Sequence, residues 1–150
     1  MKRRDLLALA GGTLVTSAGC LRRLRADRAD GPPSVDAPTV ELVAGEETTA
    51  TVRAENVESM TINVFAVPVE NERASRPRVT IGDEYLTPAP ISTEESMPPN
   101  WYWSPPRATV THETPLRVPD DVSPGTYEYP VNISKGSRRE SDPLEVRVTV

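Results

Sequence analysis

Thr126–Ile133, with the sequence Thr-Tyr-Glu-Tyr-Pro-Val-Asn-Ile, has the clearest strand pattern in this chain. Its apolar and polar residues alternate, which is the period of a strand with one buried face. Four large side chains would share that face: Tyr127, Tyr129, Val131 and Ile133. Pro130 cannot donate a hydrogen bond within a sheet, so we expect this strand to lie at an edge or to be bulged there.

The same alternation continues outward on both sides. Towards the C-terminus, the polar residues 135–142 predict a hairpin that leads into a last, valine-rich strand. Towards the N-terminus, residues 119–125 predict a turn, in which Gly125 supplies the backbone freedom. In all, the alternation predicts seven strands, over residues 39–44, 48–55, 60–67, 78–81, 108–118, 126–133 and 144–150.

Two proline-rich segments interrupt this pattern. Residues 82–106 contain six prolines, and loops of this length are typically functional or mobile. We therefore expect an irregular Pro-rich insertion at about 82–106. The other segment, Asp30–Ser34, contains Gly and two adjacent prolines, which predict a stiff, extended linker in front of the folded body.

Residues 116–127, Leu-Arg-Val-Pro-Asp-Asp-Val-Ser-Pro-Gly-Thr-Tyr, resemble the C-terminal half of immunoglobulin-like domains of prokaryotic surface proteins. The Val-Ala-Gly-Glu turn at 43–46 is similar to their first hairpin. The resemblance covers residues 39–67 and 107–150. It implies an all-β fold, an immunoglobulin-like two-sheet sandwich of about seven strands over residues 38–150, and it transfers no catalytic residues.

Residues 1–19 have the order of an export signal: a charged start, an apolar run over 6–18 and small residues at the end. The run is shorter than the ~20 residues of a stable membrane-spanning helix. Arg3 and Arg4, followed by a spacer and leucines, resemble the twin-arginine signal that exports folded proteins. The pattern predicts a signal peptide of the twin-arginine type over residues 1–19.

Ser17-Ala18-Gly19-Cys20 resembles a lipobox, in which cleavage before the cysteine is coupled to lipid attachment on its sulfur. Lipoboxes usually carry an aliphatic residue where this chain has Ser17. Cys20 is the only cysteine, so no disulfide can form within the chain. We expect a lipidated Cys20, with residues 20–37 as a basic juxtamembrane stretch and linker, and a body on the outer face of the cytoplasmic membrane.

Two alternatives to this N-terminal reading stay open. Cys20 could be an ordinary small residue at the end of a hydrophobic run. The arginine-rich residues 21–28 could also indicate an uncleaved or misoriented segment, because basic residues normally stay on the cytoplasmic side. Where the segment is exported, the same arginines could rest on anionic lipid head groups.

The body is acidic, since residues 35–150 contain 19 acidic and 10 basic side chains. Such a surface repels phosphates, which argues against nucleic-acid binding. With 15 Arg, 2 Lys and few aromatic residues, the chain resembles exported proteins of halophilic archaea.

Catalytic and metal-binding patterns are scarce in this sequence. His112 is the only histidine, lies on a predicted inward face and has no nucleophile-elbow motif with it, so we interpret it as structural. One histidine and one cysteine cannot assemble a blue-copper site. The paired acids Glu94-Glu95 and Asp120-Asp121 are candidates for calcium or for a small hydrolase, although a solvated surface explains them more simply. We expect no enzyme activity, metal or cofactor.

Two features suggest contacts outside the chain. Trp101, Tyr102 and Trp103 could stack on a sugar or a partner, although the tryptophans more often close a core that is poor in aromatic residues. Asn132 begins an Asn-Ile-Ser sequon and is a candidate glycosylation site. The leading hypothesis is a lipid-anchored surface protein with a structural or protein-interaction role. The alternative is a module that binds a glycan or another ligand through residues 101–103.

Overall fold

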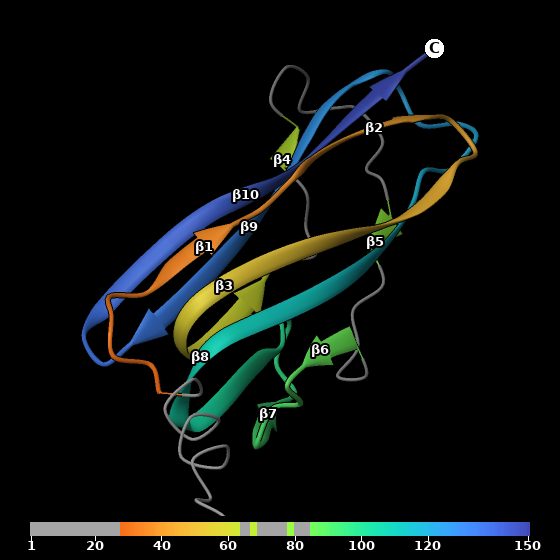
Figure 1. Ribbon diagram of the computed structural model, residues 1–150. Coiled ribbons are helices and arrows are strands. Elements are labelled where there is room, and N and C mark those ends of the chain that lie inside the picture. Colours follow the sequence, from red (N-terminus) through yellow and green to blue (C-terminus); the bar gives the residue numbers. More distant parts are fainter. Residues whose placement is uncertain (1–27, 64–66, 69–77, 80–84) are drawn as a thin grey trace, which may run out of the picture.

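The computed structural model of the protein describes residues 28–63, 67–68, 78–79 and 85–150, and these form an all-β domain (Figure 1). The long strands are β2 Thr39–Val43, β3 Glu47–Ile62, β8 Asn100–Arg117, β9 Gly125–Lys135 and β10 Arg138–Thr149. The short ones are β1 Ser34–Asp36, β4 Val67–Pro68, β5 Arg78–Val79, β6 Leu86–Thr87 and β7 Ser92–Glu94.

These strands form an immunoglobulin-like β-sandwich whose two layers are joined through one strand. One layer runs β2-β10-β9, and the other contains β3 and β8 with most of the short strands along them. β3 connects the layers because its N-terminal part pairs with β8, whereas residues 59–62 also pair with β9. The prediction of an all-β sandwich is confirmed, but the hydrogen bonding is continuous, and the described residues form ten strands where about seven were expected.

The core lies between the layers and is filled by the inward residues of the alternating strands. All four apolar residues predicted for the inner face of β9 are buried, as are Ala50, Val52 and Ala54 of β3 and Val110 of β8. Burying side chains of this size stabilises the fold by ~1.5–3 kcal/mol for each large one. The period of two in the sequence therefore identified the core face correctly.

The prediction that Pro130 marks an edge strand or a bulge is wrong, because β9 lies between β10 on one side and β3 and β4 on the other, and its register with β10 runs through Pro130 without a shift. The backbone of Pro130 faces the side of β3, where its carbonyl oxygen accepts a hydrogen bond from Asn63 N at 2.9 Å. β3 ends at Ile62 and β4 begins at Val67. The nitrogen of Pro130 thus faces the chain just beyond the end of β3, outside the described pairs of β9 with β3 and β4.

β3 is a single strand where the sequence predicted a break at residues 56–59. Asn56 adopts a φ of 55°, and the register with β8 shifts between Val57 and Ser59. An irregularity of this kind bends a strand without ending it. The bend lets one strand contribute to both layers.

The irregular insertion predicted at 82–106 is shorter than expected. Its last residues, from Asn100, belong to β8, and β6 and β7 pair with the same strand. Four residues of β8, 103–106, lie within the register shift opposite β3. Pro105 and Pro106 therefore lie within β8, where its register with β3 shifts, and they do not end the strand.

The predicted linker packs on the body. Ser34 pairs with Glu55 across β1 and β3, so the sheet begins before the expected boundary at residue 38. Gly31 N donates to Asn56 Oδ1 at 3.2 Å, and Asn56 Nδ2 donates to the carbonyl of Pro32 at 2.8 Å. Residues 30–34 were predicted as a stiff, extended linker in front of the body, and the structure places them against it.

Candidate functional site

A face of neutral polar side chains, here called the polar platform, covers the outer side of the sheet where β10, β9, β3 and β8 meet. Their inward neighbours, such as Met60 and Ile133, are buried, so the alternation of each strand turns the polar residues outward. The platform consists of Ser59, Thr61, Asn100, Tyr102, Asn132 and Ser134.

Cross-strand register arranges the polar platform in two rows. Asn132 lies opposite both Thr61 and Ser141, and Thr61 lies opposite Asn100. In the second row, Ser59 lies opposite both Ser134 and Tyr102. Directly opposed residues in a sheet are close enough for their side chains to interact.

Hydrogen bonds between these side chains fix the rows. The hydroxyl oxygens of Ser59 and Ser134 are 2.6 Å apart, and the Thr61 hydroxyl donates to Asn100 Oδ1. Asn100 Nδ2 then donates to Ser96 Oγ at 3.0 Å. The platform is thus a pre-organised set of hydroxyl and amide groups without a formal charge of its own.

Tyr102 is the aromatic member of the polar platform, with 36% of its surface exposed. Its hydroxyl donates to Glu94 Oε2 at 3.0 Å. This hydrogen bond to Glu94, together with desolvation and the negative charge of the same carboxylate, raises the pKa of Tyr102. The phenol therefore stays protonated and its ring is held beside the two rows.

A hollow of about 520 Å³ lies over the polar platform. Arg139, Glu140 and Ser141 of β10 complete its wall. Asn132 is exposed and points outward, as predicted, and its glycosylation stays a prediction. The sequence indicated the outward side of each strand, but only the long-range register brings these residues together.

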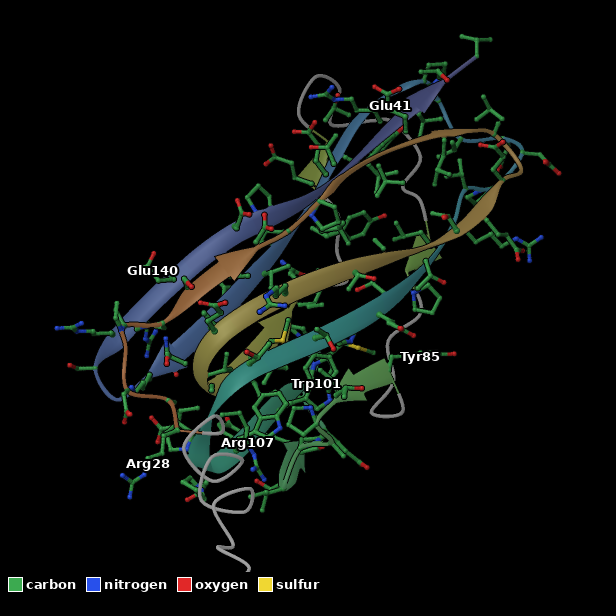
Figure 2. All side chains as sticks on the ribbon, in the orientation of Figure 1. Arg28, Glu41, Tyr85, Trp101, Arg107 and Glu140 are labelled. Atoms are coloured by element: carbon green, nitrogen blue, oxygen red, sulfur yellow. The ribbon has the colours of Figure 1, made fainter. Side chains whose placement is uncertain are left out.

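Trp101 and Trp103 lie inside the core, 1% and 0% exposed, so neither ring can stack on a ligand from solvent. Figure 2 labels Trp101. The Trp103 indole N–H donates to the carbonyls of Pro88 and Ala89, both at 3.1 Å. These bonds hold the segment before β7 against the body. Of residues 101–103, Tyr102 alone is available for an external contact.

His112 is also buried, with 0% of its surface exposed. Its Nδ1 lies 2.7 Å from Thr114 Oγ1, and its ring centroid lies 5.2 Å from that of Trp101. Burial lowers its pKa to about 4 from the ordinary 6.5. A neutral imidazole closed off from solvent suits a structural role.

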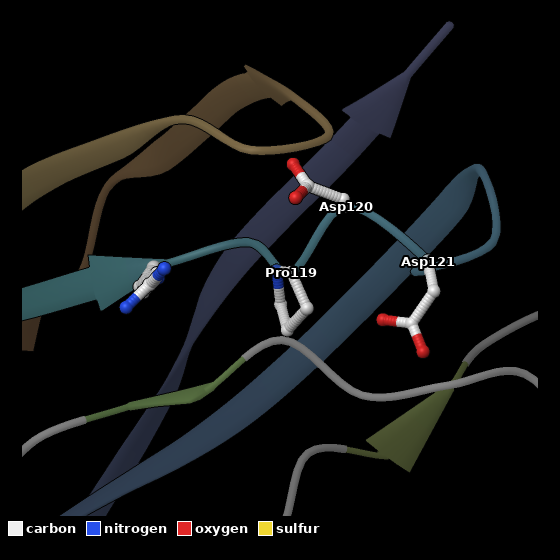
Figure 3. A pocket seen from close by; sticks show the side chains of 4 residues that line it. Pro119, Asp120 and Asp121 are labelled. Atoms are coloured by element: carbon white, nitrogen blue, oxygen red, sulfur yellow. The ribbon is translucent and has the colours of Figure 1, made fainter.

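The paired acids do not converge. Asp120 and Asp121 line a shallow hollow beside Arg117 and Pro119, and their carboxylates point in different directions (Figure 3). Glu94 lies elsewhere, at the end of β7, and accepts a hydrogen bond from Tyr102. Among the residues that the structure describes, no group of three or more His, Cys, Asp or Glu side chains could hold a metal ion.

The residues of the predicted export and lipidation signals, Arg3, Arg4 and Cys20, lie outside the described part of the chain. Within that part, no helix is long and apolar enough to cross a membrane.

No protein-family model matches this chain, and no curated protein matches it. Among solved structures, the third ScaB cohesin of R. flavefaciens, solved in complex with a group 1 dockerin, is similar at 13% identity and a TM-score of 0.45, over 82% of this chain and 99% of that one. A non-cellulosomal cohesin from Archaeoglobus fulgidus is similar at 11% identity and a TM-score of 0.39, over 80% and 93% of the two chains.

A family 123 glycoside hydrolase from Clostridium perfringens is similar at 12% identity and a TM-score of 0.40. The match covers 78% of this chain but 27% of the hydrolase. At these identities and TM-scores the three likenesses assign no activity and no partner.

Proposed function

We propose that this chain is an exported surface protein of a halophilic archaeon, held on the outer face of the cytoplasmic membrane by a lipid on Cys20. The support is the order of its first 20 residues, in which a twin-arginine pair precedes a short apolar run and the single cysteine. The acidic, arginine-rich body fits a protein that works in a salty exterior.

In this proposal the body has a non-catalytic role and binds another protein through the polar platform. The observation that carries it is the pair of rows of neutral, mutually hydrogen-bonded side chains across β9, β3 and β8. Elsewhere the outer face of β3 is charged, with Glu47, Arg53 and Glu55 in ion pairs. A neutral area of fixed donors and acceptors resembles the polar part of a protein interface.

Site-specific photo-crosslinking in intact cells tests this role. A photoreactive residue in place of Asn132, at the centre of the platform, is expected to give one discrete covalent adduct. The same residue in place of Glu41, exposed on β2, is the matched control and is expected to give none. The same adducts from both positions, or none from Asn132, would contradict the proposal.

The second candidate function is binding of a neutral glycan on the same platform. It is favoured by the exposed ring of Tyr102, which the Glu94 carboxylate holds beside the hollow of about 520 Å³. Aromatic rings and amide or hydroxyl groups together suit polyhydroxylated ligands. Calorimetric titration with neutral oligosaccharides tests this candidate: binding that Tyr102→Ala abolishes would support it, and an absence of binding to wild type would exclude it for those sugars.

A further inference from the structure

The described basic side chains divide into two groups. Three of them form ion pairs with carboxylates: Arg53 with Glu55 at 3.3 Å, Arg117 with Glu47 at 3.3 Å and Arg147 with Glu145 at 2.6 Å. Five others have no carboxylate within 4.0 Å in the described part of the chain. These five are named the basic end: Arg28, Arg107, Lys135, Arg138 and Arg139.

The basic end is a single region of the molecule. Lys135 and Arg138 face each other across the two-residue turn between β9 and β10, and Arg139 follows. The Lys135 ammonium donates to the carbonyls of Ala29 and Gly31, the latter at 2.8 Å. The N-terminal segment is thereby tied to the hairpin.

Arg28 and Arg107 complete this region: an isolated antiparallel backbone bridge joins Arg28, which precedes β1, to Arg107 of β8. Figure 2 places both at one end of the molecule, away from Glu41 and from the C-terminus that Figure 1 marks. The Nε of Arg107 is buried and has no hydrogen-bond partner among the described residues. No carboxylate lies within 4.0 Å of Arg107 in the described part of the chain, so its positive charge is not paired there.

The opposite end of the long strands is acidic. Glu46, Asp120 and Asp121 are exposed there, in the turns before β3 and before β9. Two backbone hydrogen bonds hold these turns together: Gly45 N donates to the Val118 carbonyl at 2.8 Å, and Val118 N donates to the Glu46 carbonyl at 2.9 Å.

Carboxylates also lie at the basic end: Glu58 accepts a hydrogen bond from Gly136 N at 2.6 Å, and Asp30 and Glu140 line hollows beside its cations. The five cations of the basic end still outnumber these three carboxylates, whereas at the opposite end the acidic side chains outnumber Arg117.

The chain enters the body at the basic end. Arg28 is the first described residue, and three more arginines, Arg22, Arg23 and Arg25, lie between it and Cys20 in the sequence. A single acyl chain gives only marginal, reversible membrane attachment, and a polybasic patch is one of the second signals that make attachment stable. Arginine is suited to phosphate because its guanidinium can donate two parallel hydrogen bonds.

We propose that the basic end docks on the anionic phosphates of a lipid bilayer and orients the sandwich with its acidic end away from the membrane. This inference rests on the export and lipid anchor proposed above. It adds four groups of the folded body, Arg107, Lys135, Arg138 and Arg139, to the membrane-binding surface. The polar platform, whose hollow reaches Arg139, then stands next to the membrane.

Vesicle partitioning of the full chain tests the inference. All proteins carry Cys20→Ser, so that no lipid contributes, and each is measured on neutral phosphatidylcholine vesicles and on vesicles with anionic phosphatidylglycerol. The quantity compared is the partition coefficient on anionic vesicles divided by that on neutral vesicles. The apolar run at residues 6–18 contributes to both coefficients, so its contribution cancels in this ratio. Measurements start at the lowest salt concentration at which circular dichroism shows every protein folded, because salt screens exposed charges.

Each basic residue near an anionic surface strengthens binding about fivefold. The double variant Arg138→Gln with Arg139→Gln loses two of them, so it is expected to lower the ratio about thirtyfold near 0.1 M salt. The matched control, Arg117→Gln with Arg147→Gln, makes the same change in net charge at paired positions and is expected to change the ratio less than about threefold. The loss should shrink as salt is raised.

Equal losses in the two double variants, or no loss in either, would overturn the inference. The lipid anchor has a separate readout, the mass of the protein with its natural Cys20. If the protein is lipidated and the two double variants lose binding equally, the lipid anchor is supported and the docking surface is rejected. If the protein is not lipidated but the Arg138/Arg139 variant loses more binding than the control variant, the docking surface is supported and the lipid anchor is rejected.

Discussion

The single histidine of this protein is expected to make its stability depend on pH. In the folded protein the pKa of His112 is lowered to about 4 by burial, against 6.5 in the unfolded chain. The unfolded chain therefore binds the proton first as the pH falls. The stability that depends on neutral His112 is complete above pH 6.5 and is lost as the pH falls towards 4.

The size of the effect follows from the two pKa values. Each unit of difference corresponds to about 1.4 kcal/mol, so wild type should lose about 2 kcal/mol between pH 7 and pH 5 from this group alone, and about 3 kcal/mol by pH 4. The ordinary pKa values of Asp and Glu lie lower, near 4, so the window from pH 7 to pH 5 belongs mainly to the histidine.

Urea unfolding of wild type and His112→Asn, followed by tryptophan fluorescence at several pH values, measures this loss. The asparagine retains a polar group towards Thr114 but does not titrate, and all carboxylates are common to both proteins. Whatever the stability of the variant at pH 7, wild type should lose about 2 kcal/mol more than the variant by pH 5. Parallel curves would refute the argument that a buried neutral imidazole is needed here, and His112→Phe repeats the test if the first variant does not fold.

Three further predictions concern the fold. Gly45→Ala should cost about 1–3 kcal/mol of unfolding free energy in denaturant titrations, because Gly45 has a φ of 87° and an added Cβ would lie 2.5 Å from Asp120 Oδ1; an unchanged midpoint would contradict this. Lys135→Met should release the N-terminal segment and speed its cleavage by trypsin, since it removes the donor to two carbonyls of that segment; wild-type cleavage rates would show that the contact does not hold it. Trp101 and Trp103 should emit at shorter wavelength than in the unfolded chain and resist quenching by acrylamide, because both are buried; ready quenching would show that they are exposed.

The core of this fold could be predicted from the sequence because burial follows the period of two. The arrangement and the boundaries of the strands were predicted wrongly at residues whose conformation depends on contacts with distant parts of the chain. Pro130 looked like an edge residue, but its nitrogen faces the chain just beyond the end of β3, some 65 residues earlier in the sequence. Asn56 looked like a loop, but its positive φ produces a bend within β3. Neither feature has a local signal.

The candidate sites were less predictable than the core. For Trp101 and Trp103 the sequence favoured a place in the core over a ligand contact, because aromatic side chains bury large areas, and both are buried. Ser59 and Ser134, whose hydroxyl oxygens meet at 2.6 Å, are ordinary residues until the register of β3 and β9 is known. The basic end likewise depends on a hairpin and an N-terminal segment that are 104 residues apart at the Lys135–Gly31 contact.

The most direct test of the proposed surface location is intact mass spectrometry combined with membrane fractionation, on wild type and Cys20→Ser expressed in a halophilic archaeal host. Wild type is expected to be bound to the membrane, to begin at Cys20 and to carry the added mass of a lipid, whereas the variant is expected to be released or left unprocessed. If both proteins retain residues 1–19 and fractionate alike, the lipid anchor is contradicted, and the arginines that follow Cys20 would be the first residues to mutate in search of the reason.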